Sequence, residues 1–151
     1  MTTGRRKGRE TAFQILYRYD LGKQESGTTP PEGDALDLDL TGHFEHFGTP
    51  EEQRPFATGL VRGILERLAE LDELLERHAR NWRVSRMAFV DRTLLRLAAY
   101  EILYAGIPVS VAIDEALELG KQFGTSDTAP FLNGILDAIA REKTDGQSRP
   151  A

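Results

Sequence analysis

The sequence contains no cysteine among its 151 residues. This absence excludes disulfide bonds, thiolate zinc sites and cysteine nucleophiles, and it is typical of proteins that fold in a reducing compartment. No apolar run approaches the roughly 18 residues that a membrane span needs. No apolar stretch follows the basic residues of the N-terminus to form a signal peptide either. We therefore expect a cytoplasmic protein without a membrane partner.

The sequence also lacks the motifs by which catalytic sites are most easily identified. It has no glycine-rich dinucleotide or phosphate loop, no nucleophile elbow and no zinc-protease helix. His43 and His46 could share a metal ion, but no third ligand is evident, so the pattern favours solvated histidines. Asp114, Glu115 and Glu118 are expected on the solvent side of a helix rather than as an acid–base pair. We therefore predict that the protein is not an enzyme and binds no metal ion or cofactor.

Glycine and proline are concentrated in one part of the chain. Nine of the 21 glycines and prolines lie within residues 22–55, and most of this acidic segment is predicted to be a long connection. Apolar and acidic residues alternate over 35–40 as in a strand, but no partner strand appears elsewhere in the sequence. A short helix at about 36–47 is therefore favoured within this connection.

Outside that segment, apolar residues recur with the period of an α-helix. Residues typical of helix starts and ends predict five helices outside that segment. The first ends at Gly22, and the second runs from a capping box at Thr49 to His78 with a bend near Arg67. The third is capped by Ser85 and ends at Gly106, the fourth runs from Ser110 to Gly124, and the last runs from Ser126 or Asp127 to Arg141. The tail at 143–151 is expected to fray. With 40% apolar and 28% charged residues, residues 1–151 are predicted to form a single domain, an all-α compact bundle of about seven helices.

The net charge of −5 argues at first sight against a nucleic-acid partner, but the charge is unevenly distributed. Residues 1–20 carry a net charge of +3, residues 21–55 carry −6, and residues 77–96 carry +5. One acidic segment therefore accounts for the negative total, while two other segments are basic. The average charge does not exclude a polyanionic partner.

The first basic segment begins a helix with four cations in five residues, namely Arg5, Arg6, Lys7 and Arg9. Cations at a helix N-terminus oppose the helix dipole and repel one another, so nearby phosphates would stabilise them. Arginine, which provides 15 of the 19 basic residues, binds phosphate through two parallel hydrogen bonds and stacks on bases. On composition alone, a solubilising N-terminal tail explains this cluster equally well.

Two further features are weaker indications of nucleic-acid binding. The basic segment 77–96 is interleaved with aromatic residues, Trp82 among them, but its arginines drift around a helix and a salt-bridged scaffold is favoured. Residues 124–126, between Lys121 and Asp127, lead into a helix N-terminus that could receive a phosphate. Any capped helix has free backbone N–H groups at its N-terminus, so the second feature alone does not indicate phosphate binding.

Four motifs in combination are more specific. The sequence reads R-x-x-R-E-x-A-x-Q-x-L-Y from Arg6, L-x-R-x-A-x-Y-E-I from Leu94, V-A-I-D-E-A-x-E-L-x-K-x-F-G from Val111 and F-L-N-G-I-L-D from Phe131. With these motifs the chain resembles the NusB family of transcription antitermination factors. The resemblance runs over about residues 5–141, and residues 23–48 match poorly.

The resemblance implies an all-helical RNA-binding protein of two small subdomains. Members of this family bind the boxA element of nascent ribosomal RNA leaders, a single-stranded RNA, together with the ribosomal protein NusE. They do so in an antitermination complex that makes RNA polymerase resist termination. The family's RNA contacts map onto Arg5, Arg6, Lys7, Arg9, Lys121, Asp127 and Phe131. The family's NusE-binding side maps onto Tyr17 and Asp91.

The sequence departs from the family pattern at two places. Ala129 and Pro130 stand where many relatives have a basic or polar pair, which could reshape the second part of the RNA surface. The acidic segment 23–48 could shield the RNA or partner surfaces. Two other hypotheses stay open: a helical interaction module that binds only a protein, and a homodimer that covers the arginine-rich helix. The aromatic residues of the 36–47 segment suggest the second of these.

Overall fold

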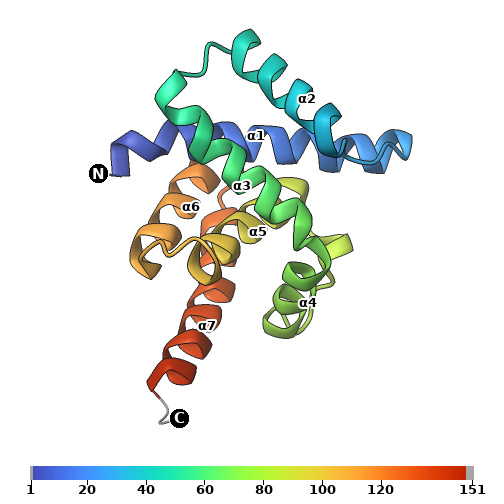
Figure 1. Cartoon of the computed structure of the whole chain (residues 1–151). Helices are drawn as coiled ribbons and strands as arrows, with labels where there is room; N and C mark the ends of the chain where they lie inside the picture. The colour runs from blue at the N-terminus through green and yellow to red at the C-terminus, as the bar shows by residue number, and fades with distance from the viewer. Residues whose placement is uncertain (1, 149–151) are drawn as a thin grey trace. The chain divides into compact units, whose positions relative to one another are not determined.

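The computed structural model describes residues 2–148, with side chains over 5–143, and helices are the regular elements of this part (Figure 1). The elements are α1 (Thr2–Ser26), α2 (Gly33–His46), the 3-10 turn η1 (Glu51–Gln53), α3 (Arg54–Glu66), α4 (Leu68–His78), the 3-10 turn η2 (Val84–Arg86), α5 (Phe89–Leu103), α6 (Val109–Phe123) and α7 (Thr128–Ser148). The predicted all-α fold of about seven helices is confirmed. None of the described helices is long and apolar enough to span a membrane.

The chain divides into two compact units, as the family resemblance implies. The N-terminal unit is Met1–Gly63 and the C-terminal unit is Ile64–Ala151, so the boundary falls within α3. The N-terminal unit contains α1, α2, η1 and most of α3, and the C-terminal unit contains the end of α3 and everything after it.

In the N-terminal unit, Asp39 of α2 joins that helix to α1. Its carboxylate accepts a hydrogen bond of 2.8 Å from the Arg18 guanidinium and another from the Tyr19 hydroxyl. Burial alone would raise the pKa of Asp39, but the hydrogen bonds from Arg18 and Tyr19 outweigh it and hold that pKa below its usual value. Burial and the hydrogen bond to Asp39 raise the pKa of Tyr19. The charged form of Asp39 is therefore the form that the folded N-terminal unit favours.

In the C-terminal unit, α5 is the central helix, packed against α4, α6 and α7. Its apolar residues face in nearly all directions, and six of them are fully buried: Leu94, Leu95, Leu97, Ala98, Ala99 and Ile102. A solvent-facing stripe is narrow on such a helix because neighbours cover most of its circumference. The prediction of a central buried helix is confirmed.

Helix α6 and helix α7 approach each other closely at two glycines. A Cβ atom on Gly120 would lie 3.0 Å from Cγ2 of Thr128 and 3.2 Å from Cδ1 of Leu132. One on Gly124 would lie 2.7 Å from Cβ of Thr128. Thr128, the first residue of α7, therefore occupies space that only glycine leaves free at the end of α6.

The connection predicted at 23–48 is shorter than expected, and the helix favoured within it at about 36–47 is confirmed as α2. Helix α1 does not stop at Gly22 but continues to Ser26, and the stop is Gly27, whose φ of +67° favours glycine. Helix α2 then takes up residues 33–46, so the true connection is only 27–32. A glycine within a helix lowers its stability without ending it, which explains why α1 continues past Gly22.

Three predicted helix ends also differ. Thr49 forms no capping box, because the 3-10 turn η1 comes before α3. The N-cap of η1 is Pro50, which makes no side-chain hydrogen bond. Ser85 does not cap α5, because η2 occupies that position and α5 begins at Phe89. The last helix does not end at Arg141 but continues to Ser148, and the rest of the tail predicted to fray, 149–151, lies outside the described residues. The predicted bend near Arg67 is confirmed, since Arg67 separates α3 from α4.

Candidate nucleic-acid interface

The arginine-rich start of α1 displays three of its four cations. The side chains of Arg5, Arg6 and Lys7 are exposed, whereas Arg9 is only 2% exposed. Lys7 forms an ion pair of 3.2 Å with Glu10, one turn further along α1. The exposed positive charge of this helix start therefore comes from residues 5–7.

The aromatic ring of Phe56, on α3, lies under two of these arginines. The guanidinium carbons of Arg5 and Arg9 are 5.0 Å and 5.3 Å from the centre of the ring. At an exposed site such as that of Arg5, a cation–π contact stabilises by about 0.5–1 kcal/mol. Phe56 therefore restricts the arginine side chains to one part of the surface without neutralising their charge.

The backbone of the same turn is fixed at Gly8. Its N–H donates a hydrogen bond of 2.9 Å to Oε1 of Gln53. A Cβ atom at this position would lie 3.1 Å from the Gln53 carbonyl oxygen and 3.1 Å from Cδ2 of Phe56. The basic turn of α1 is thus packed onto η1 and α3, which an unstructured solubilising tail would not be.

Sequence reasoning did not identify Phe56 or Gln53 as parts of this site. Both are distant in sequence from the basic cluster, and their contacts arise only when α3 packs on α1. The motif groups Arg9 with the RNA contacts, but its side chain is buried, unlike those of residues 5–7. No local signal in the sequence separates Arg9 from its exposed neighbours.

On the predicted NusE-binding side of the N-terminal unit, Tyr17 is half-buried. Its ring lies 5.9 Å from the ring of Phe13, measured between centroids, on the preceding turn of α1. The two rings are tilted relative to each other, and Tyr17 keeps part of its surface accessible. It lies more than two turns along α1 from the exposed cations.

In the C-terminal unit, the three residues predicted to contact RNA come from the end of α6 and the start of α7. Lys121 is exposed and forms an ion pair of 3.5 Å with Glu118. Asp127 is exposed and its N–H donates to the Thr125 hydroxyl at 3.3 Å. Phe131 is half-buried, and its ring contacts another aromatic ring, that of Trp82.

The structure brings Asp91 to the same loop. The Thr128 hydroxyl donates a hydrogen bond of 3.0 Å to Oδ1 of Asp91, and it accepts one of 3.0 Å from the Thr125 N–H. The residue predicted for the NusE-binding side is therefore bonded to the residue next to Asp127, which was predicted for the RNA side. Within this unit the two predicted surfaces adjoin.

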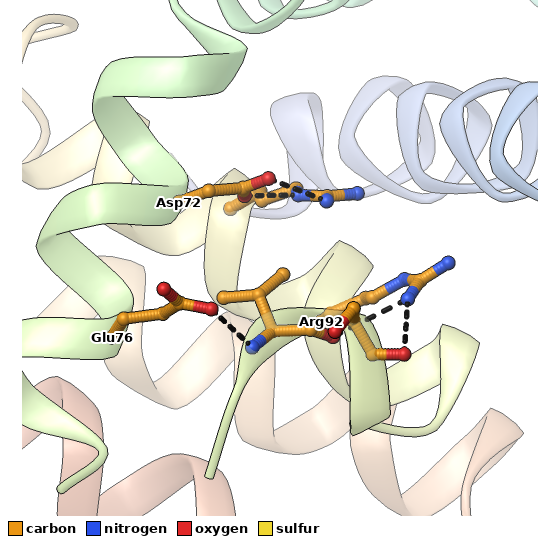
Figure 2. Close-up of polar contacts among 6 residues, drawn as sticks. Asp72, Glu76 and Arg92 are labelled. Carbon is orange, nitrogen blue, oxygen red and sulfur yellow. Dashed lines mark hydrogen bonds and ion pairs between the residues drawn. The ribbon is translucent and has the colours of Figure 1, made fainter.

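The second basic segment, 77–96, separates into paired and exposed arginines. Arg96 forms a bidentate ion pair with Asp72, at 2.7 and 2.9 Å, and Arg92 donates to the backbone carbonyls of Val84 and Ser85 (Figure 2). These two arginines and Arg77, which pairs with Glu142 at 3.5 Å, belong to the expected scaffold. The remaining arginines of the segment, Arg80, Arg83 and Arg86, are exposed.

Two expectations about acidic and histidine side chains need correction. His43 is buried rather than solvated, its Nε2 has no hydrogen-bond partner among the described residues, and its ring packs against Phe47. Glu115 is buried as well, because it lies on the stripe of α6 that also carries Ala112 and Leu119. Among the described residues, no group of three or more histidine or acidic side chains could hold a metal ion.

A scan against protein-family models matches the NusB family over residues 6–141. Among curated proteins, the transcription antitermination protein NusB of Solibacter usitatus is 42% identical over 149 residues, covering 97% of this chain and 95% of that one. The protein of the same name from Symbiobacterium thermophilum is 44% identical over 142 residues, covering 91% and 89%.

Solved structures give the same result. T. maritima NusB has a TM-score of 0.78 and 34% identity, and covers 95% of this chain and 96% of its own. A chain in the crystal structure of the antitermination factors NusB and NusE in complex with double-stranded RNA has a TM-score of 0.77 and 26% identity, covering 94% and 99%.

Proposed function

The chain belongs to the NusB family of transcription antitermination proteins, which are not enzymes, and from this premise we propose that it binds boxA-type single-stranded RNA together with NusE. In this role it forms part of the complex on nascent ribosomal RNA transcripts that helps RNA polymerase to resist termination. Such a protein acts in the cytoplasm, where bacterial transcription takes place.

The observation that carries this proposal is the basic turn of α1. Arg5, Arg6 and Lys7 are exposed on a helix start whose backbone is fixed to Gln53 at Gly8. A helix N-terminus favours anions, and arginine side chains bind phosphate through two parallel hydrogen bonds. Because the cations are held in place, less conformational entropy is lost when RNA binds than with a flexible tail.

The partner assignment has support from a relative. A similar chain has been crystallised with NusE and double-stranded RNA. By this similarity we assign Tyr17 and Asp91 to the NusE-binding side of this protein. Lys121, Asp127 and Phe131 form the second part of the RNA surface, and all three are at least partly accessible. The homodimer, which the sequence leaves open as an alternative, stays a hypothesis.

A titration of a boxA-type oligoribonucleotide, with and without NusE and at several salt concentrations, tests the proposal. We expect a linear fall of log K with log salt, with a slope that decreases by about 0.7 for each cation removed by Arg5→Ala or Arg6→Ala. Arg54→Ala is a matched control, because Arg54 lies in the same unit but donates to the Thr49 carbonyl at 2.9 Å. Binding that is independent of salt, or unchanged in both α1 variants, would contradict the proposed site.

A further inference from the structure

The chain's one tryptophan is largely exposed. Trp82 lies in the connection between α4 and α5 and keeps 52% of its surface accessible to solvent. Burying such a side chain would contribute free energy to folding, so its exposure needs another explanation. Its ring contacts Phe131 in a T-shaped arrangement, with centroids 5.8 Å apart and an interplanar angle of 77°.

The connection that carries Trp82 is held firmly to the C-terminal unit. Val84 and Met87 are buried, and the Val84 N–H donates a hydrogen bond of 2.8 Å to the carboxylate of Glu76 (Figure 2). Arg92 donates to the Val84 carbonyl at 3.3 Å from the opposite side of the same peptide segment. Because the backbone is bonded on both sides of Val84, the neighbouring exposed side chains are displayed from a fixed position.

The exposed charged side chains of this connection are basic. Arg80, Arg83 and Arg86 are exposed, and none of the three forms an ion pair within the part of the chain that the structure describes. Residues 79–88 contain no acidic residue, and the single Glu76 carboxylate bonded to Val84 does not balance three arginines, so the loop keeps a net positive charge. Arg80 also has a positive φ of 33°, which a non-glycine residue adopts only when its surroundings impose it.

We propose that residues 80–86 form a further single-stranded RNA contact, in which an unpaired base stacks on Trp82 and adjacent phosphates bind Arg80, Arg83 and Arg86. The proposal rests on the proposed function, and it adds a stacking platform beside Phe131, which the family motif places at the RNA surface. Proteins that bind single-stranded RNA combine such aromatic platforms with basic side chains along the strand.

RNA fits this loop better than a protein partner does. A protein surface that buried Trp82 would also bury three guanidinium groups, and each would need an acidic partner at a defined position. A flexible polyanion supplies phosphates at regular intervals along its backbone, so it can pair with all three arginines while a base covers the indole. An acidic protein partner is thus the alternative that the experiment must separate.

The experiment uses Trp82 as its own reporter, because the chain has no other tryptophan. The full-length protein is titrated with a boxA-type single-stranded oligoribonucleotide while tryptophan emission is recorded, and with the same strand annealed to its complement. We expect the single strand to quench the emission and the duplex to quench it much less, since paired bases are not free to stack. Affinity is then measured by anisotropy of labelled RNA for the variants.

We expect Trp82→Ala to raise Kd by about 5- to 150-fold, the range of one base–aromatic stack. Trp82→Phe retains a stacking ring and should bind more tightly than Trp82→Ala, and the urea midpoint of each variant shows whether it is folded. Phe47→Ala, at an aromatic residue that is 61% exposed in the acidic segment, is the matched control and should bind as the wild type does. Arg83→Ala and Arg86→Ala should each lower the salt slope by about 0.7.

If the wild type binds RNA, but Trp82→Ala binds equally well and emission is not quenched, the loop is not an RNA contact, although the proposed function stands. If Trp82→Ala weakens the complex with NusE and leaves the RNA affinity unchanged, the loop is a protein contact and the inference is overturned. If the wild type binds no boxA-type RNA at any salt concentration, the proposed function fails and the inference fails with it.

Discussion

The Thr128 hydroxyl donates a hydrogen bond of 3.0 Å to Oδ1 of Asp91, which ties the start of α7 to the start of α5. Thr128 is only 2% exposed, and its hydroxyl also accepts from the Thr125 N–H. Asp91 therefore has a structural role in the C-terminal unit besides the NusE contact proposed for it. The two roles make different demands, because the hydrogen bond needs an acceptor whereas an ionic contact needs the charge.

Substitution of Asp91 separates these roles. Asp91→Asn keeps an acceptor for the Thr128 hydroxyl, so we expect its free energy of unfolding in urea to stay within about 0.5 kcal/mol of wild type. Asp91→Ala leaves a buried hydroxyl without its acceptor and should lower that free energy by about 1–3 kcal/mol. Both variants should lose affinity for NusE in calorimetric titrations if the charge is what NusE recognises.

Wild-type NusE affinity in Asp91→Asn, together with reduced affinity in Asp91→Ala, would mean that Asp91 only positions the loop. Asp137→Asn provides a comparison, since Asp137 is an exposed acidic residue of α7 whose partner is Arg141, one turn away. Loss of the Asp137 charge should change the free energy of unfolding by no more than a few tenths of a kcal/mol, and it should not change the affinity for NusE.

A methyl group at Gly124 should be poorly tolerated. The Cβ atom of Gly124→Ala would lie 2.7 Å from Cβ of Thr128 and 2.8 Å from the Gly120 carbonyl oxygen, so α6 and α7 must move apart. Overpacking of this kind costs about 1–3 kcal/mol. Gly134→Ala is the opposite case, because Gly134 is exposed within α7 and nothing lies within 4 Å of its Cβ position. It should stabilise by about 0.5–1 kcal/mol in the same urea experiment, through helix propensity.

The helices were predictable from the sequence wherever an apolar stripe continued for several turns. α5 is the clearest case, since its apolar residues point in nearly all directions and only a central position buries them. α2 was predicted at about 36–47 from the short apolar stripe of Leu36, Leu40 and Phe44, but its first residues were assigned to the connection. Its stability depends on packing and on contacts such as Asp39 with Arg18, which no local pattern reveals.

The site was predictable to the extent that it consists of motif residues. The exposed cations at 5–7 were identified, but the burial of Arg9 was not, because burial depends on neighbours that are distant in sequence. Glu115 shows the same limit: an acidic side chain reads as solvent-facing, although the helical period places it with the buried residues of α6. Composition indicates which side chains prefer to be exposed to solvent, but the tertiary structure determines which of them are exposed.

Phe56 should affect RNA binding through the order of the arginines rather than through charge. In Phe56→Ala the guanidinium of Arg5 loses its aromatic support, so ordering it on RNA costs about 0.5–1.5 kcal/mol more and Kd should rise about two- to tenfold. The slope of log K against log salt should stay unchanged, since no cation is lost. Arg5→Ala should reduce that slope by about 0.7 in the same anisotropy titration. A smaller slope in Phe56→Ala would show that the ring supports phosphate contacts themselves and not only their order.

Acid should weaken the N-terminal unit through His43. Burial lowers the pKa of this imidazole, and the nearby positive charge of Arg18 lowers it further, while Asp39 opposes the shift. A histidine whose pKa is lower in the folded than in the unfolded state binds protons more readily when unfolded. Its contribution to stability is therefore present above the unfolded pKa of about 6.5 and decreases as the pH falls below it.

We expect the urea concentration at the unfolding midpoint of the wild type to decrease when the pH is lowered from 7.5 to 5. His43→Gln should reduce this pH dependence of the midpoint, because glutamine does not titrate. Asp39 adds a loss of stability at lower pH, since its carboxylate, with its lowered pKa, must be protonated on unfolding in acid. His46→Gln is the control, because His46 is exposed at the end of the same helix and packs edge-on against Phe47. An equal change of slope in the two histidine variants would assign the effect to the helix terminus and not to the buried imidazole.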